Sequence, residues 1–227
     1  MRVPQGVRRI PVSQARDWEG IYRDATAPPW NLGEPQPELA RLIEDGRIHG
    51  TVLDAGCGHA EFALAVAAAG HSVVGLDISA TAVAAATAAA ADRGLTTAHF
   101  ASADLTDFGG YDGRFDTLVD SGLLHSLPAD KRQGYLASIH RAAATGAVLY
   151  ILAFAAETFG DDDPDRGGPH GFTAEELRAT VAPLWVVDDV RPATVYSSTP
   201  GHRATADATG RGMMAGLLLH AHKPRGS

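Results

Sequence analysis

The sequence predicts an α/β fold built on a doubly wound, mostly parallel sheet, and three observations lead to that prediction. Short β-rich runs alternate with helical segments from Thr51 onwards, which is the order of βαβ units. A glycine-rich turn joins the first run to the first helical segment, as in sheets that bind ligands at their carboxyl edge. Late strand-like runs follow one another without a helix, which predicts a C-terminal antiparallel hairpin at the sheet edge.

The expected strands are short runs of apolar and β-branched residues. Phe115–Val119 is of the buried type and Ala147–Phe154 is the longest apolar run, whereas Ala98–Ser102 is weaker. In chain order, the runs expected to form strands are Thr51–Ala55, Ser72–Leu76, Ala98–Ser102, Phe115–Val119, Ala147–Phe154, Trp185–Val190, Ala193–Ser197 and Gly216–His222.

The expected helices carry apolar faces or start signals. Leu39 and Leu42 share one face of the first helix. Ser79 is the expected N-cap of a long alanine-rich helix, and Thr173 with Glu176 forms a capping box. In chain order, the expected helices are Glu38–Gly46, Ala60–Ala69, Ser79–Arg93, Ala129–Ala144 and Thr173–Thr180.

Length and composition predict a single folded domain over residues 1–227, with residues 1–16 as a loose arm, because the chain is 45% hydrophobic. The net charge of -8 disfavours a nucleic-acid partner. No apolar run approaches the ~18 residues of a membrane span, and no signal peptide precedes the domain, so a cytoplasmic protein is expected. Cys57 is the single cysteine, and the acidic run 161–165 lacks calcium-loop spacing, so we expect no metal site.

The first candidate motif runs from Val52 to Glu61, after the first strand and into the first helix. Gly56 and Gly58 let a ligand approach the backbone, and the free N–H groups at the helix start favour a carboxylate or phosphate. A nicotinamide site prefers a third glycine, but Glu61 stands there and would repel a pyrophosphate. Asp54, before the glycines, suits a cationic group of the ligand.

Three further acidic motifs follow the next three strands. Asp77 ends the second strand, about 20 residues after the glycines, where it can take both hydroxyls of a ribose. Asp104 follows the third strand, and Asp120 ends the fourth in a stretch that continues to His125. In this order and spacing, the four motifs resemble those of class I S-adenosylmethionine (SAM)-dependent methyltransferases over Thr51–Pro128. That resemblance implies a seven-stranded sheet and SAM as the cofactor.

The resemblance also implies a role for each motif residue. Asp54 and the glycine loop would hold the methionine end of SAM, and Asp77 would bind the ribose hydroxyls. Asp104 would meet the exocyclic amine of the adenine, and Asp120 would face the amino-acid part or the methyl group. The implied cofactor-binding residues are Trp30, Asp54, Gly56, Cys57, Gly58, Asp77, Ile78, Asp104, Leu105 and Asp120.

The N-terminal segment carries a finer resemblance. An aromatic stretch with Trp18 and Tyr22, followed by Pro-Pro-Trp30-Asn, is similar to the thiopurine and tellurite methyltransferase branch. It is most similar to bacterial heterocyclic toxin methyltransferases, which act on hydroxyquinolone-like rings. This implies that residues 1–46 form an arm and lid over a Rossmann-like core of residues 47–227. Trp30 would lie near the sulfonium, and Trp18 and Tyr22 would line the substrate side.

Methyl transfer from a sulfonium requires positioning and the removal of at most one proton. His125 follows the fourth strand and has an unperturbed pKa of about 6.5, so it is the best candidate for a general base. His170, in a Gly/Pro-rich loop after the fifth strand, is the second candidate. An acidic acceptor that arrives already ionised needs no base.

The expected activity is methylation of an O or N atom of a small aromatic heterocycle, a detoxification-type reaction whose second product is S-adenosylhomocysteine. The enzyme is expected to be a monomer or a homodimer. Alternatives are another small acceptor such as a thiol, thiopurine or tellurite, a non-catalytic SAM-binding protein, or an NAD-dependent oxidoreductase, which Glu61 disfavours. A nucleic-acid acceptor is disfavoured because Asp120-Ser121-Gly122-Leu123 replaces the Asn/Asp-Pro-Pro-aromatic pattern.

Overall fold

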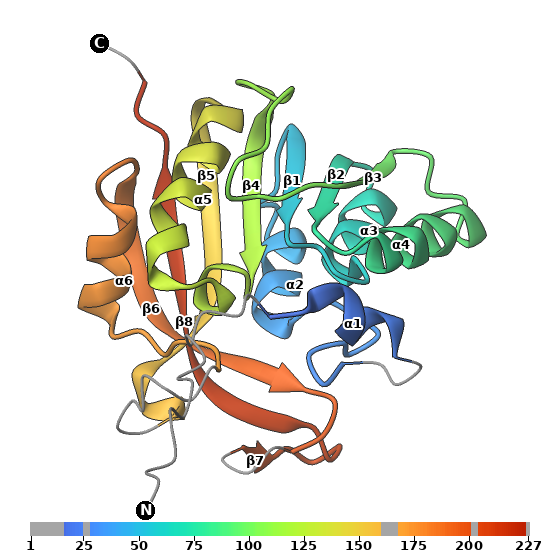
Figure 1. The fold of residues 1–227 in the computed structure, drawn as a ribbon, viewed down its shortest axis with the longest axis vertical. Coiled ribbons are helices and arrows are strands. Elements are labelled where there is room, and N and C mark those ends of the chain that lie inside the picture. Colours follow the sequence, from blue (N-terminus) through green and yellow to red (C-terminus); the bar gives the residue numbers. More distant parts are fainter. Residues whose placement is uncertain (1–15, 25–27, 160–167, 201–203, 226–227) are drawn as a thin grey trace, which may run out of the picture.

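The computed structural model describes residues 16–24, 28–159, 168–200 and 204–225. A central sheet runs through the molecule with helices on both faces (Figure 1). The strands are β1 (Thr51–Ala55), β2 (Ser72–Asp77), β3 (Ala98–Ser102), β4 (Phe115–Ser121), β5 (Ala143–Phe154), β6 (Val186–Ser197), β7 (Thr205–Ala206) and β8 (Gly212–His222). The helices are α1 (Trp18–Arg23), α2 (Pro37–Glu44), α3 (Glu61–Ala68), α4 (Ala80–Asp92), α5 (Ala129–Ala142) and α6 (Ala174–Val181), with short 3₁₀ turns η1 (Leu124–Ser126) and η2 (Ala156–Thr158).

The sheet has the predicted doubly wound topology. Its strand order is β3-β2-β1-β4-β5-β8-β6, and β7 pairs with β8. The first five strands along this path pair in parallel, and β8 pairs antiparallel to both β5 and β6. The parallel core and the antiparallel C-terminal edge are therefore confirmed. The sheet has eight strands rather than seven because the two-residue β7 adds to the predicted set.

Two hydrophobic clusters lie on opposite faces of the sheet, since successive side chains of a strand point to opposite sides. Leu53 and Leu118 pack with α5 and α6 on one face. Val52 and Val119, their neighbours in sequence, pack with α2, α3 and α4 on the other face. This alternation explains why the strands are apolar throughout, because both faces are covered.

The C-terminal edge differs from the prediction in one respect. The two runs Trp185–Val190 and Ala193–Ser197 form one long strand, β6, instead of two. Pro192 lies inside it opposite Leu217, and an edge strand tolerates proline because its outward N–H needs no partner. The antiparallel hairpin is therefore β6 with β8, and its far end extends below the rest of the sheet in Figure 1.

Helix starts follow the predicted chemistry in two places. The Ser79 side chain accepts a hydrogen bond from the N–H of Ala82, and that of Thr173 accepts one from the N–H of Glu176. The Glu176 carboxylate bonds to His170, so it serves that contact instead of the expected return bond to Thr173. The helix α1 was not predicted; Asp17 caps it by accepting from the N–H of Gly20.

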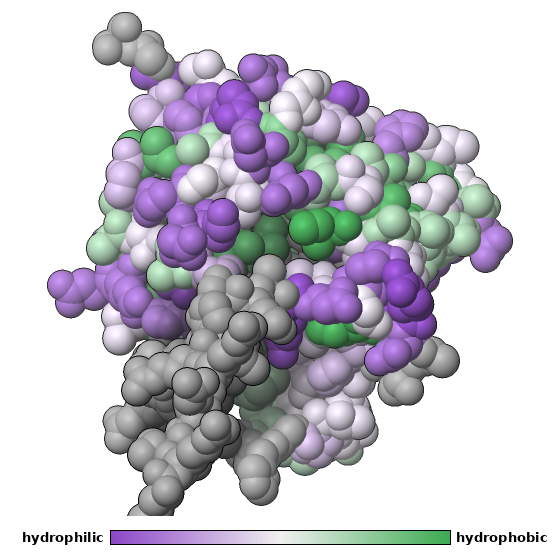
Figure 2. All heavy atoms as spheres, viewed as in Figure 1, coloured by the Kyte–Doolittle hydropathy of each residue, from purple (hydrophilic) through white to green (hydrophobic). Residues whose placement is uncertain are grey.

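The described surface mixes polar and apolar residues. Figure 2 shows hydrophilic and apolar residues interspersed over one face of the molecule. Within the described ranges, none of the helices has the length and apolar character that a membrane crossing needs. Residues 1–15 of the expected arm and the acidic run 161–165 lie outside the described residues.

Candidate cofactor and acceptor site

A cavity of about 590 Å³ lies at the carboxyl ends of the parallel strands. One part, which we call the acidic half, is lined by residues at or just after the carboxyl ends of β1, β2 and β3: Asp54, Gly56, Cys57, Gly58, Asp77, Ile78, Asp104 and Leu105. The other part, which we call the apolar half, is lined by residues of η1, β5, β6 and β8 and by the residue after η2: His125, Leu152, Phe154, Phe159, Val195 and Met214. The predicted cofactor motifs thus meet on one wall.

The glycine loop between β1 and α3 has the backbone that the motif requires. Gly56 and Gly58 adopt positive φ angles of 74° and 53°. The N–H groups of Gly56 and Cys57 both donate to the carbonyl oxygen of Leu76, at 2.8 and 3.0 Å. A Cβ atom at position 58 would lie only 2.5 Å from the Tyr22 hydroxyl. The loop therefore depends on glycine both for its conformation and for the close approach of another group.

Asp77 joins the end of β2 to the glycine loop. Its carboxylate accepts hydrogen bonds from the N–H groups of Gly58, at 2.8 Å, and Ser79, at 2.9 Å. Burial raises the pKa of the Asp77 carboxyl, and these N–H groups act against that rise. Each carboxylate oxygen has a second lone pair, so the group can still accept from two ligand hydroxyls.

Ile78 and Asp104 border the same wall. Ile78 is 52% exposed, which is unusual for a large apolar side chain, and it lines the cavity. Asp104 accepts from the hydroxyl and the N–H of Thr106, and these bonds lower the pKa of its carboxyl. Leu105 beside it is buried. An exposed apolar surface flanked by an ionised carboxylate is suited to an aromatic ring that bears an amine.

Asp54 is the most deeply buried of the cavity carboxyls. One of its oxygens accepts from the N–H of Ala63 at 3.1 Å, at the start of α3. Burial, together with the nearby charges of Asp77 and Asp120, raises the pKa of Asp54 to about 7. A cation in the cavity would favour the ionised form and relieve this repulsion. The acidic half is therefore suited to a positively charged ligand.

Asp120, which the resemblance assigns to the amino-acid part or the methyl group of SAM, lies behind the cavity wall. It is fully buried, and it accepts from the N–H groups of Leu123 and Leu124 and from the Tyr135 hydroxyl. Among the described residues, the cavity wall includes its neighbours Ser121 and Gly122 but not Asp120 itself. Its carboxylate holds the turn after β4, and so it positions His125 from behind the wall.

The described residues of the N-terminal segment contribute Trp18, Tyr22 and Trp30 to the cavity wall. The Tyr22 hydroxyl packs against Gly58 and accepts from the Trp30 indole N–H at 3.2 Å. Its ring meets His59 edge to face, with 5.1 Å between the ring centroids. Tyr22 therefore contacts the glycine loop of the acidic half. Trp18 packs edge to face on Trp30 at 5.9 Å and lines the cavity.

Two polar contacts that the sequence did not reveal hold this segment in place. Glu19 of α1 accepts from the hydroxyls of Ser79 and Thr81 at 2.7 and 2.6 Å, which lowers the pKa of its carboxyl to about 2. The Gln36 side chain makes two hydrogen bonds of 2.9 Å with the backbone of Tyr196 in β6. No local pattern marks such contacts, because the partners lie 60 and 160 positions away.

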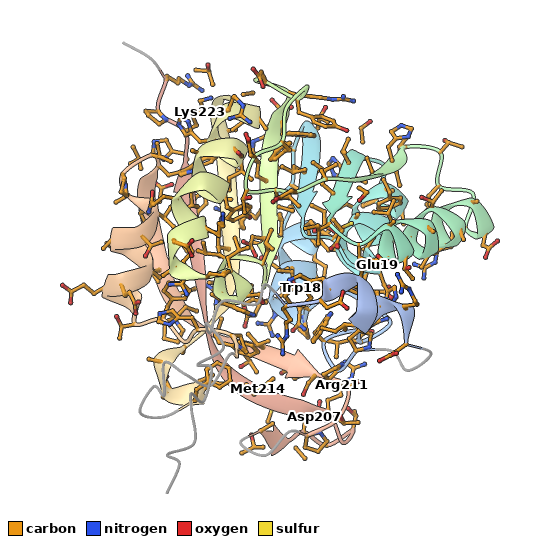
Figure 3. The ribbon with its side chains drawn as sticks, in the orientation of Figure 1. Trp18, Glu19, Asp207, Arg211, Met214 and Lys223 are labelled. Carbon is orange, nitrogen blue, oxygen red and sulfur yellow. The ribbon has the colours of Figure 1, made fainter. Side chains whose placement is uncertain are left out.

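The apolar half is built from the far end of the hairpin and the end of β5. Figure 3 labels Trp18 on α1 and Met214 on β8, and both line the cavity. Phe154 packs edge to face on Phe159 at 5.1 Å and stacks on His125 at 4.4 Å. Its walls therefore present aromatic faces and a thioether to an occupant.

His125 lies in the wall of the cavity, but its hydrogen bonds argue against the predicted base. Its Nδ1 accepts from the N–H of Phe154 at 3.2 Å, which places the proton on Nε2. Burial lowers the pKa of His125 to about 3, with a further contribution from the charge of Arg132. A neutral imidazole with Nδ1 occupied and Nε2 protonated has no lone pair to accept a proton. It can instead donate a hydrogen bond.

His170, the second candidate base, is not among the described residues that line the cavity. Its Nε2 lies 2.7 Å from the Glu176 carboxylate, and its ring packs edge to face on Phe172. Its backbone N–H donates to the carbonyl oxygen of His125 at 2.7 Å. His170 therefore supports the backbone of His125 from outside the cavity.

Comparison with known proteins gives close relatives. Residues 52–146 match a family model described as a methyltransferase domain. A 2-heptyl-1-hydroxyquinolin-4(1H)-one methyltransferase of Mycobacteroides abscessus is 47% identical over 208 residues, which cover 88% of this chain and 90% of that protein. A probable thiol methyltransferase of Arabidopsis thaliana is 30% identical over 170 residues, which cover 74% of this chain and 72% of that protein.

Solved structures agree with these relatives. A structure described as "Conversion of a Disulfide Bond into a Thioacetal Group during Echinomycin Biosynthesis" is 31% identical, with a TM-score of 0.80 and coverage of 94% and 93% of the two chains. The fold is shared by a Burkholderia thailandensis 1,6-didemethyltoxoflavin-N1-methyltransferase with bound S-adenosylhomocysteine, at 22% identity, a TM-score of 0.61 and coverage of 83% and 77%. The 47% identity to the hydroxyquinolone methyltransferase, over almost all of both chains, shows that the protein belongs to the class I SAM-dependent methyltransferases.

Proposed function

We propose that this methyltransferase transfers the methyl group to an O or N atom of a small aromatic heterocycle of the hydroxyquinolone type. The main support is the apolar half of the cavity, where aromatic and thioether side chains surround the imidazole of His125, which can form hydrogen bonds. A planar, largely apolar acceptor with one polar edge is complementary to such walls. The hydroxyquinolone methyltransferase that is 47% identical to this chain supports the same acceptor class.

The acidic half supports the following assignment for SAM, which supplies a methyl group on a positively charged sulfonium. Asp54 and the glycine loop bind the methionine end, where a carboxylate with uncompensated charge attracts the cationic groups. Asp77 binds the ribose hydroxyls through its free lone pairs. The full proposed set is Trp30, Asp54, Gly56, Cys57, Gly58, Asp77, Ile78, Asp104 and Leu105. Cys57 contributes its backbone, because burial raises the pKa of its thiol and keeps it neutral.

In this proposal, residues 1–46 act as a lid on a single domain. Tyr22 packs against the glycine loop, Trp30 is hydrogen-bonded to Tyr22, and both residues line the cavity, which supports a place for their rings near the sulfonium. Trp18 closes the side of the cavity that leads to the acceptor. Both substrates are thereby screened from water, and reactions of this type gain most from the alignment of the two reacting atoms.

The first experiment is calorimetric titration of the protein with SAM, S-adenosylhomocysteine and NAD. We expect micromolar binding of the two adenosyl ligands and none of NAD. The second step is a screen of 1-hydroxyquinolin-4-ones, hydroxyquinolines, phenols and thiophenols for methylated products by mass spectrometry. Preferential turnover of the quinolones supports the proposal. Methylation of thiophenols alone would transfer the assignment to the thiol-type acceptor suggested by the Arabidopsis relative.

A further inference from the structure

We propose that this enzyme takes its acceptor as a preformed anion, which the Nε2–H of His125 and the charge of Arg16 bind, and that no residue of the cavity acts as a general base. The inference rests on the proposed acceptor class and adds the ionisation state that the site selects. The hydrogen bonds of His125 and His59 and the positions of the charged side chains around the cavity support binding of an anion.

The proton on His125 is placed by a donor that has no alternative state. A backbone N–H can only donate, so the 3.2 Å contact from Phe154 makes Nδ1 an acceptor and leaves the proton on Nε2. No described residue accepts a hydrogen bond from Nε2. This atom lies beside Gly122, where a Cβ would be 3.2 Å away, and both residues line the cavity. The Nε2–H of His125 is therefore available to donate a hydrogen bond to a molecule in the cavity.

The second cavity histidine is held in the same way. The Asn31 side-chain oxygen accepts from the N–H of Gly33, so its amide nitrogen is the donor to His59 Nδ1 at 2.7 Å. Its proton therefore also lies on Nε2. Tyr22 accepts from Trp30, and burial raises the pKa of its phenol, so it stays neutral. None of these three groups offers a basic lone pair to an acceptor.

Among the residues that the structure describes, the charges that act on the His125 imidazole are cationic. Arg16 from the N-terminal segment, Arg132 from α5 and His170 from the loop before α6 face it and lower the pKa of its imidazole. Arg16 also lines the cavity, and its guanidinium lies over the Trp18 ring at 5.2 Å. Arg132 is held by Leu127 and Phe172, so it contributes to the potential from behind the wall. A negative acceptor is attracted to this side.

The carboxylates of the cavity lie elsewhere or are paired. Asp54, Asp77 and Asp104 belong to the acidic half, where the cofactor is proposed to bind. Glu34 is bound by Arg211 at 2.6 Å, and Glu61 lies 4.0 Å from Arg93. An anion beside His125 would therefore face cations and an N–H donor, with the positive sulfonium on its other side.

Methyl transfer to an anionic acceptor requires no general base. The acceptor loses its proton to water before it binds. In the cavity, a lone pair of the anionic oxygen forms the new bond to the methyl carbon. The electron pair of the broken S–C bond stays on sulfur, so the positive charge and the negative charge disappear together. His125 keeps its proton throughout and only holds the oxygen in line.

The first test is the pH dependence of kcat/KM for a series of ring-substituted 1-hydroxyquinolin-4-ones that differ in acidity. We expect the rate to rise with pH and its midpoint to shift with the pKa of each acceptor. A midpoint that stays the same for every acceptor would indicate an enzyme base and overturn the proposal. Binding of each acceptor to the enzyme saturated with S-adenosylhomocysteine, measured against pH, gives a readout that needs no turnover.

The second test compares variants. His125→Gln retains an N–H donor near the position of Nε2 and is expected to keep the greater part of kcat/KM and the acceptor-dependent midpoint. His125→Leu removes the donor and is expected to lose about ten- to a hundredfold, as for a hydrogen bond to a charged group. Arg16→Gln, at an exposed position outside the helices and strands, is expected to weaken binding of the anion severalfold. Arg225→Gln makes the same charge change outside the cavity and is the control.

The outcomes separate this inference from the proposed function. If no quinolone binds or reacts, the acceptor class is wrong. If quinolones react but the neutral forms bind to the loaded enzyme as tightly as the anions, only the inference is overturned. Equal activity of Arg16→Gln and Arg225→Gln would remove Arg16 from the anion site, and it keeps the test informative should His125→Leu fail to fold.

Discussion

The two halves of the cavity are built in different ways. The acidic half comes from residues 54–105, and its side chains lie at or just after the carboxyl ends of parallel strands. The apolar half brings together η1, the end of β5 and the far end of the β6–β8 hairpin, with the N-terminal segment above it. Neighbouring parallel strands place their carboxyl ends together by topology alone, whereas the apolar half depends on contacts between distant segments.

The halves also differ in charge. The acidic half contains carboxyls whose pKa values are raised by burial, so their ionised forms are destabilised in the free protein. The apolar half presents an imidazole N–H and an arginine. This opposition suits a cationic methyl donor on one side and an electron-rich acceptor on the other. It also means that substitutions in each half should affect one ligand and spare the other.

Asp77→Ala should give the largest effect, and only on the cofactor. The change removes the acceptor of the Gly58 and Ser79 N–H groups together with the proposed ribose contact. We expect SAM affinity to fall by on the order of ten- to a hundredfold, corresponding to about 1–3 kcal/mol. Calorimetry with SAM and S-adenosylhomocysteine measures this effect.

The matched control is Asp92→Ala, which removes an exposed carboxylate at the end of α4 away from the cavity. It should leave SAM affinity unchanged. Equal SAM affinity in Asp77→Ala and the parent protein would remove Asp77 from the cofactor site, and with it the division into two halves.

The pH dependence of SAM binding should be the next largest effect. Below a pH of about 7 the free protein holds a proton on Asp54, and a cationic ligand must displace it. Affinity is therefore expected to fall by up to about tenfold per pH unit below that value. Titration from pH 5.5 to 8 in buffers of different ionisation enthalpy measures both the affinity and the released proton.

The folding stability of the ligand-free protein should also depend on pH through Asp54. Because the folded pKa of Asp54 lies above the ordinary value of an aspartate, the folded, ligand-free protein binds this proton more tightly than the unfolded chain. Its contribution to stability is full below about pH 4 and is lost as the pH rises to about 7. Asp54→Asn, which keeps an oxygen for the Ala63 N–H, should flatten both profiles. Unchanged profiles would assign the titration to another group.

Met214→Ala should give the smallest effect, and only on the acceptor. Shortening a side chain in the wall of the apolar half is expected to raise KM for the acceptor about three- to tenfold, since one buried methylene contributes about 0.8 kcal/mol. SAM affinity should not change. Met213→Ala is the control, because adjacent residues of β8 point to opposite faces. A similar effect of both substitutions on SAM binding would contradict the independence of the halves.

The sequence predicted the core of the fold well because its signals are local. Apolar runs, glycines and caps place β1 to β4 and the helices α3 to α6 close to their observed bounds, whereas β5 begins at Ala143, before the predicted start at Ala147. The errors arose where a distant partner decides the structure. Ala193–Ser197 continues β6 across Pro192 because β8 pairs with the whole length. α1 forms where Glu19 reaches the hydroxyls of Ser79 and Thr81.

The same distinction applies to the site. The motif acids Asp54, Asp77 and Asp104 line the cavity as expected, because strand ends converge in any parallel sheet of this order. Asp120 also ends a strand, but Tyr135 and two N–H groups of the following turn occupy its carboxylate. No sequence pattern distinguishes a strand-end acid that faces a ligand from one that holds a turn.

Signals between residues that are close together in the chain are enough to indicate the family and the parallel core. The role open to His125, in contrast, depends on contacts between distant parts of the chain. Its Nδ1 meets the N–H of Phe154, 29 positions away, and its burial holds it neutral, so a residue type that suggests a base becomes a donor. The protonation of an imidazole follows from its neighbours in space, and these are set when β4 and β5 pair.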